Sequence, residues 1–149
     1  MGSQSDYPVM KDTEKILNLL KIKYEVLTVS AHRTPKRMFE FAENASKKGF
    51  GVIIAGAGGA AHLPGMVSSL ATIPVIGVPI ESKKLKGLDS LLSIVQMPRG
   101  CPTATMAING SFNAGLFAAS IIGTFDHKIR SNLERWKRLQ TKSVKKKPK

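Results

Sequence analysis

The side chain best suited to acid–base chemistry is His32, which lies in the polar segment SAHRTP at residues 30–35. Imidazole exchanges protons near neutral pH without assistance from its surroundings. The neighbouring Arg33 offers a planar cation with several N–H donors, which suits a phosphate or a carboxylate. A loop histidine more often only hydrogen-bonds the backbone, but its place beside Arg33 and near other anion-binding segments favours a catalytic role for His32.

Two further segments share the character of residues 30–35. Residues 56–66 (GAGGAAHLPGM) follow the apolar run at residues 51–55, and seven of these eleven residues are Gly or Ala, so a ligand can approach their backbone closely. Residues 2–6 (GSQSD) contain Asp6, which could accept two hydrogen bonds from a vicinal diol such as a ribose. For His62 in the glycine-rich segment, a structural role and a site role are about equally open.

All three segments are expected to follow strand positions and to open helices. The carboxyl ends of parallel strands meet at one edge of a sheet, where helix amino termini favour a phosphate or carboxylate. We expect strands at residues 24–29, 51–55, 74–78 and 103–108. We expect helices at residues 9–20, 35–45, 63–71, 88–95, 113–123 and 129–140, with Thr34 as the N-cap of the second.

Alternating strands and helices predict an α/β fold, a three-layer αβα sandwich with a mainly parallel sheet. Such a sheet needs a strand before its first helix, yet almost nothing precedes Gly2. We therefore expect the first strand to be missing or truncated, and we hypothesise that the natural chain starts upstream of Met1. Residues 1–125 are expected to form the catalytic domain, residues 126–143 an amphipathic helix that packs on this domain or on a neighbouring subunit, and residues 144–149 a Lys-rich tail.

The composition indicates where the protein is located and which kinds of partner it has. The chain has 149 residues and one cysteine, Cys101, which excludes an internal disulfide and makes the cytoplasm the expected compartment. No apolar run is long enough for a membrane span. The net charge is +13, but residues 128–149 hold ten of the 23 Lys and Arg residues and one of the ten acids, so a solvated tail is favoured over a nucleic-acid surface. The segment at residues 113–123 is apolar on nearly every side, which indicates a subunit interface.

Several catalytic motifs are absent from the sequence. There is no phosphate-binding Gly-Lys-Ser/Thr loop, no dinucleotide fingerprint, no acid cluster suited to a metal and no Ser-His-Asp set. We therefore expect neither a cofactor nor a metal. Any reaction here must depend on binding, backbone electrostatics and one mobile proton.

The three polar segments closely resemble the catalytic subunit family once called phosphoribosylaminoimidazole carboxylase. The glycine-rich segment is of the type found in its 5-(carboxyamino)imidazole ribonucleotide mutases. Further similarity covers residues 74–79, 89–100 and 113–114, and the resemblance as a whole covers residues 1 to about 123. Residues 107–114 are shorter than the usual family segment.

The resemblance implies a flavodoxin-like sheet, a homo-octamer with sites at subunit contacts, and transfer of a carboxylate on a ribonucleotide without a cofactor. It implies that His32 is the proton shuttle, that Ser3 and Arg33 bind the phosphate and that Asp6 binds the ribose. Ala57 and Gly58 are implied to hold the carboxylate, and His62 to play a supporting part. The full set of expected substrate-binding residues is Ser3, Asp6, Ser30, Arg33, Ala57, Gly58, His62 and Leu63.

Two alternatives remain open at this point. The first is direct carboxylation of the unsubstituted aminoimidazole ribonucleotide, as in animal-type relatives with the same fold. The second is a non-catalytic, basic α/β module that binds a nucleotide or a nucleic acid, although no aromatic stacking platform is visible. A catalytically dead homologue is also compatible with a truncated start.

Overall fold

A parallel three-stranded sheet forms the centre of the computed structural model, which describes residues 1–147. The strands β1 (Ile53–Gly58), β2 (Val75–Ile80) and β3 (Ala104–Thr105) lie in the order β1-β2-β3. Every residue of β2 is buried, as expected for a central strand covered on both faces.

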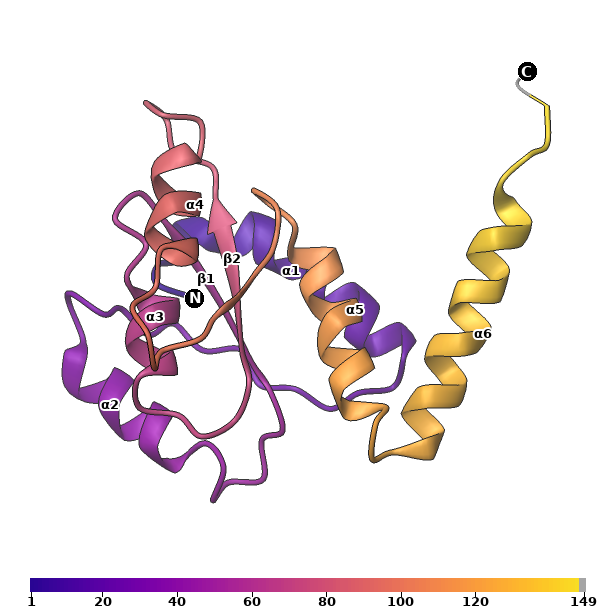
Figure 1. The fold of residues 1–149 in the computed structure, drawn as a ribbon, viewed down its shortest axis with the longest axis horizontal. Helices are drawn as coiled ribbons and strands as arrows, with labels where there is room; N and C mark the ends of the chain where they lie inside the picture. Colours follow the sequence, from indigo (N-terminus) through magenta and orange to yellow (C-terminus); the bar gives the residue numbers. More distant parts are fainter. Residues whose placement is uncertain (148–149) are drawn as a thin grey trace.

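Helices cover both faces of this sheet. The helices α2 (Pro35–Asn44), α3 (Leu63–Ser68) and α4 (Leu88–Val95) lie on one side, and α1 (Tyr7–Leu19) and α5 (Ser111–Ile122) lie together on the other (Figure 1). A short 3₁₀ turn, η1 (Gln4–Asp6), precedes α1. The three-layer αβα prediction is therefore confirmed.

The helices α1 and α5 pack closely because α5 has a glycine at the contact. A methyl group added at Gly115 would collide with the side chain of Ile16, which is fully buried. The hydroxyl of Thr13 donates to the carbonyl of Ser111 at 2.8 Å, which ties the two helices together. This contact fixes α1, and with it the position of η1 at the carboxyl edge of the sheet.

Residues 24–29 were expected to form a strand, and this prediction is wrong. They run as irregular chain between α1 and α2, and only their far end pairs, through hydrogen bonds with Met1. A strand requires a partner along its length, and the sheet offers none beside these residues.

Several predicted boundaries also differ from the structure. β1 continues through Gly58, so the first residues of the expected glycine loop belong to the strand, because Ala57 and Gly58 pair with the last residues of β2. β3 covers only two of the six residues expected at 103–108, since only those two pair with β2. α3 ends at Ser68 rather than at Ala71.

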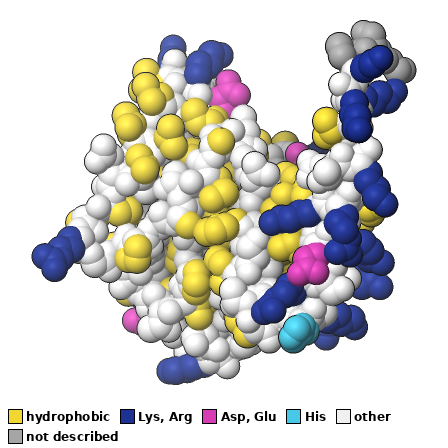
Figure 2. All heavy atoms as spheres, turned by 45° about the vertical axis from the view of Figure 1, so that its right-hand side comes forward, with side chains coloured by type: hydrophobic (Ala, Val, Ile, Leu, Met, Phe, Trp, Pro, Cys, Tyr) yellow, Lys and Arg dark blue, Asp and Glu magenta, His cyan; other side chains and the backbone are white. Residues whose placement is uncertain are grey.

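The last helix, α6 (His127–Ser143), is capped by Asp126, whose carboxylate accepts hydrogen bonds from the N–H groups of Lys128 and Ile129. Ile129 and Leu133 are buried against α1 and α5, whereas the distal half of the helix extends away from the body (Figure 1). Lys and Arg side chains gather along this helix (Figure 2). The end of the predicted tail, residues 148–149, lies outside the described residues, and no helix among residues 1–147 is long and apolar enough to cross a membrane.

Candidate active site

The three polar segments meet at the carboxyl end of β1. The N–H of Gly2 donates to the carbonyl of Gly56 at 3.0 Å, which joins the first segment to the third. The guanidinium of Arg33 lies 3.5 Å from the carbonyl of Gly2, which joins the second segment to the first. The convergence that the sequence predicts is therefore present in the structure.

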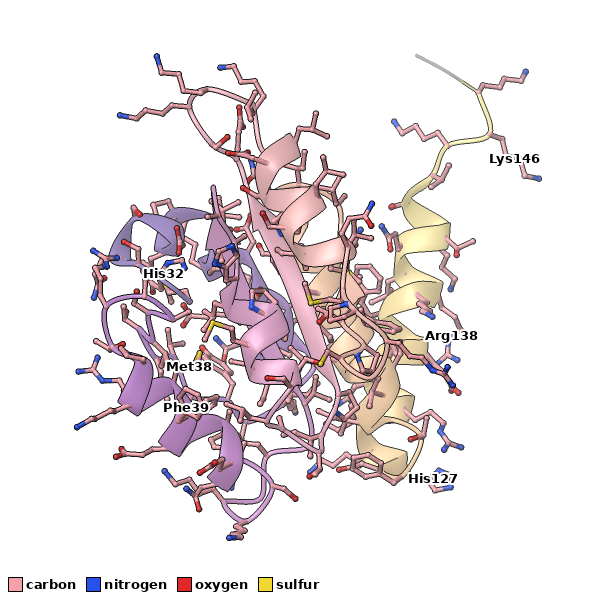
Figure 3. The ribbon with its side chains drawn as sticks, turned by 60° about the vertical axis from the view of Figure 1, so that its left-hand side comes forward. His32, Met38, Phe39, His127, Arg138 and Lys146 are labelled. Carbon is pink, nitrogen blue, oxygen red and sulfur yellow. The ribbon has the colours of Figure 1, made fainter. Side chains whose placement is uncertain are left out.

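Two histidines form the chemical centre of this edge. Nε2 of His32 lies 2.8 Å from Nδ1 of His62, and the two rings meet edge to face with centroids 4.9 Å apart. Both side chains are exposed, so a ligand can reach them. His127 lies at the start of α6, on the far side of the molecule from His32 (Figure 3).

The backbone of residues 30–34 is held by its own side chains. The hydroxyl of Thr34 accepts a hydrogen bond from the N–H of Ser30 at 2.9 Å and donates to the carbonyl of the same residue at 3.1 Å. Thr34 does occupy the N-cap position of α2, but its side chain makes no bond to that helix. Ser30 in turn accepts from the backbone N–H of Arg33 at 3.2 Å, and the Nε of Arg33 lies 3.5 Å from the same hydroxyl. These bonds fix the direction in which residues 32 and 33 leave the loop.

Asp6 turns its carboxylate back into the segment at residues 2–6. One carboxylate oxygen accepts from the N–H of Ser3 at 3.0 Å, and the side chain is 6% exposed. Burial raises the pKa of Asp6, although hydrogen bonds from Ser3 and Ser5 oppose the shift. The hydroxyl of Ser3 accepts from the hydroxyl of Ser5 at 3.0 Å and remains partly exposed, so it is available to a ligand.

The glycine-rich segment is held from α4. Gly59 has a φ of +66°, a left-handed conformation that glycine adopts easily. Its N–H donates to the hydroxyl of Ser90 at 2.8 Å, and this fully buried hydroxyl donates in turn to the carbonyl of Ile80 at 2.6 Å. Sequence reasoning did not single out Ser90, although it lies within residues 89–100, which carry part of the family resemblance.

The candidate substrate residues differ in how they can meet a ligand. Gly58 and His62 are exposed, whereas Ala57 and Leu63 are buried. These two apolar residues can contribute only through the shape of the site or through their backbone. No group of three or more His, Cys, Asp or Glu side chains within residues 1–147 could hold a metal ion.

This arrangement combines an exposed imidazole pair, one guanidinium, a hydroxyl, a buried carboxyl group and a loop with little side-chain bulk. It can bind an anion and a polar ring, exclude water beneath them and transfer a proton. Its cationic and N–H groups favour a phosphorylated or carboxylated substrate.

Comparison with known proteins gives consistent matches along the chain. The sequence profile of a family described as AIR carboxylase matches residues 1–143. The N5-carboxyaminoimidazole ribonucleotide mutase of Thermotoga maritima is 59% identical over 142 residues, which covers 93% of this chain and 83% of the relative. The mutase of the same name from Escherichia coli K12 is 51% identical over 146 residues, which covers 97% of this chain and 86% of the relative.

The fold is also that of a solved structure. The crystal structure of Treponema denticola PurE superposes with a TM-score of 0.84, covering 95% of this chain and 89% of that chain at 24% sequence identity. The likeness extends over all three layers described above.

Proposed function

Because the chain belongs to the AIR carboxylase family, we propose that it is a 5-(carboxyamino)imidazole ribonucleotide mutase of purine biosynthesis. The enzyme moves a carboxylate from the exocyclic nitrogen of its substrate to carbon 4 of the imidazole ring. Relatives with this name are 51–59% identical along nearly the whole chain. We place the reaction at this site because the His32–His62 pair lies among three segments suited to bind anions.

His32 moves the proton in the reaction that we propose. The N–CO₂ bond breaks, its electron pair stays on the exocyclic nitrogen, and protonated His32 donates a proton there. Carbon 4 of the amino-imidazole, which is nucleophilic because the ring is enamine-like, then attacks the released carbon dioxide. Neutral His32 removes the proton from carbon 4, which restores the ring and the protonated imidazole. No net proton is gained or lost.

The remaining residues bind and orient the ribonucleotide. Ser3 and Arg33 bind its phosphate, since both present donors at the edge where residues 2–6 and 30–35 meet. Asp6 accepts from the ribose hydroxyls, and Ser30 holds Arg33 in place. Residues 57–63 enclose the migrating carboxylate and keep carbon dioxide from escaping, with contacts from Ala57, Gly58, His62 and Leu63.

We propose that the enzyme works as a homo-octamer in the cytoplasm. The helix α4 has Leu88, Leu92 and Val95 on one exposed face, and on α5 Phe112 and Phe117 are 37% and 41% exposed. Contiguous apolar side chains of this kind are typical of faces that another subunit covers.

A product assay tests the proposed function directly. The chain is incubated with freshly prepared 5-(carboxyamino)imidazole ribonucleotide and, separately, with aminoimidazole ribonucleotide plus bicarbonate. We expect rapid formation of the carbon-4 carboxylate from the first substrate and slow formation from the second. Faster turnover of the second mixture would identify a direct carboxylase instead, and no turnover of either would identify a binding module or a dead homologue.

A further inference from the structure

The solvent-facing side of α6 carries an ordered set of positive charges. Six of the 17 residues of this helix are Lys or Arg, and residues 145–147 add three more lysines. Glu134 is the one acid between residues 127 and 147, so nine cations and one acid give this segment a net charge of +8. The sequence alone favours a solvated tail, whereas the structure places most of these cations on a regular helix (Figure 2).

The cations of α6 form two rows along the helix. Lys128, Arg135 and Lys142 are seven residues apart, which is almost two full turns, so they lie in one line with about 10.5 Å between neighbours. Arg130 and Lys137 form a second line with the same spacing. The two lines lie on opposite flanks of the helix, because an advance of two residues turns it by about 200°. All five side chains are exposed.

Arg138 lies between these two rows, on the face of α6 that is turned away from the body. Nine residues, or two and a half turns, separate it from Ile129, which is buried against α1 and α5. Leu133 is also buried, and Trp136 packs against Phe112 of α5 with ring centroids 6.0 Å apart. The body therefore covers the apolar side of the helix and leaves its cationic side open to a partner.

No carboxylate forms an ion pair with these cations within residues 1–147, the part of the chain that the structure describes. The one ion pair there joins Lys15 to Asp12. The guanidinium of Arg130 donates to the carbonyls of Gly123 and Thr124 at 2.7 and 2.9 Å, but neutral acceptors leave its charge in place. A polyanion would therefore meet positive charge that is not neutralised, and its binding would release counterions from its phosphates.

The arrangement of the two rows suits a DNA duplex better than a membrane or a second copy. A helix with its side chains is about 10–12 Å across and the major groove about 12 Å wide, so cations on opposite flanks reach the phosphates on both sides of the groove. A membrane-surface helix needs a free apolar face, yet the apolar side of α6 packs on the body. A second copy offers no excess of negative charge, since residues 1–126 hold thirteen Lys or Arg and nine acids.

We infer that α6 binds the phosphate backbone of duplex DNA, with its outer face in the major groove and its two rows of cations on the flanking phosphates. Such binding does not depend on base sequence, because the cations contact phosphates rather than base edges. Arg138 and Lys146 lie on the side of the molecule away from His32 (Figure 3). This inference therefore concerns a second site and does not rest on the proposed reaction.

The test measures how binding of the full chain to a duplex changes with salt. Fluorescence anisotropy follows a labelled DNA duplex of about 20 base pairs at salt concentrations from about 50 to 300 mM. A triple variant of the outer face is compared with a matched control that removes the same charge from exposed loops after α2 and β2. Alanine retains the helix. The triple variant is Arg135→Ala, Arg138→Ala and Lys142→Ala, and the control is Lys47→Ala, Lys48→Ala and Lys84→Ala.

Binding of the parent chain should weaken steeply with salt, with a slope of the logarithm of affinity against the logarithm of salt of about −4 or steeper. The triple variant should bind about tenfold or more weakly and reduce the size of the slope by about two to three, because three phosphate contacts are lost. The control should bind like the parent. Glu134→Gln removes the opposing charge on α6 and should bind more tightly than the parent.

Equal weakening by the triple variant and its control would overturn the inference, because net charge alone would then explain the binding. So would no binding of the parent to the duplex, or binding to vesicles that contain phosphatidylserine but not to the duplex. Light scattering supplies a further check, since a lower mass for the triple variant than for the parent would show that the outer face of α6 joins subunits instead.

Discussion

The two imidazoles at the site share a single hydrogen between them, because Nε2 of His32 and Nδ1 of His62 are 2.8 Å apart. One nitrogen must donate and the other accept, so the rings cannot both be protonated at these two atoms. A proton that His32 takes from a substrate therefore changes the hydrogen bond that His62 makes. In the mechanism that we propose, His62 positions the shuttle and sets its tautomer, whereas His32, beside Arg33, meets the reacting atoms.

The buried carboxyl group of Asp6 should make the stability of the protein depend on pH. Burial raises the pKa of this carboxyl group, so the folded state binds this proton more tightly than the unfolded chain does. The stability that this provides is complete below the ordinary value of 3.8 and is lost as the pH rises through the folded pKa. We expect the melting temperature of Asp6→Asn, relative to the parent chain, to increase as the pH is raised from about 4 to about 7.

Thermal melts across that pH range check this prediction. Asp12→Asn removes one charge from the surface of α1, the helix that follows Asp6, where Asp12 pairs with Lys15, and so reports the effect of net charge alone. A difference between Asp6→Asn and the parent that stays constant with pH would contradict the assignment. The same variant should bind the ribonucleotide more weakly if Asp6 contacts the ribose.

At the scale of elements, one serine on α4 holds the glycine-rich segment to the sheet. Ser90 accepts from the N–H of Gly59 and donates to the carbonyl of Ile80, so it links the segment to the end of β2. Ser93, one turn further along, bonds mainly to its own helix through the carbonyl of Asp89 at 2.7 Å. The two serines thus provide a matched pair of substitutions.

Ser90→Ala should lower the free energy of unfolding by about 1–3 kcal/mol, because the N–H of half-buried Gly59 and the carbonyl of buried Ile80 lose their partner. It should also lower kcat by about tenfold, since the segment that we propose to enclose the carboxylate loses its support. Ser93→Ala should change both quantities little. Denaturant unfolding and steady-state assays would contradict this account if the two variants behaved alike.

Some helices, strands and loops could be predicted from the sequence, and others could not. Helix α4 and the convergence of three loops follow from local patterns, namely apolar periodicity, a proline at a helix start and glycine-rich turns. The strand at residues 24–29 does not follow, because its pairing depends on a neighbour that periodicity alone cannot supply. The extension of β1 through Gly58 was hidden because Gly and Ala resemble a loop, and Ser90 was missed because its partner Gly59 lies 31 residues away.

At the scale of the whole molecule, the described chain leaves apolar faces uncovered. Leu85, Leu88, Leu92 and Val95 are each between 46% and 58% exposed, and they lie on or just before α4. The basic helix α6 lies on the opposite side, and its charge is spread along the solvent-facing surface in Figure 2. Association through α4 would cover the apolar face while leaving the basic face in water.

We expect light scattering to give the mass of eight chains for the parent protein. Leu92→Glu places a charge in the proposed interface and should reduce that mass severalfold, whereas Lys47→Glu, on the exposed surface after α2, should not. A parent protein with the mass of one chain, or an unchanged mass for Leu92→Glu, would contradict the proposed assembly.

The central claim is that His32 carries the proton in the carboxylate transfer, and His32→Asn tests it most directly. Turnover of 5-(carboxyamino)imidazole ribonucleotide and the Kd of the ribonucleotide are measured for this variant, with His127→Asn as a control distant from the site. We predict that kcat falls by at least about a hundredfold while the Kd changes little, because asparagine keeps a polar side chain but cannot exchange the proton. Near-normal turnover, or a loss of binding as large as the loss of turnover, would show that the proton moves through another group.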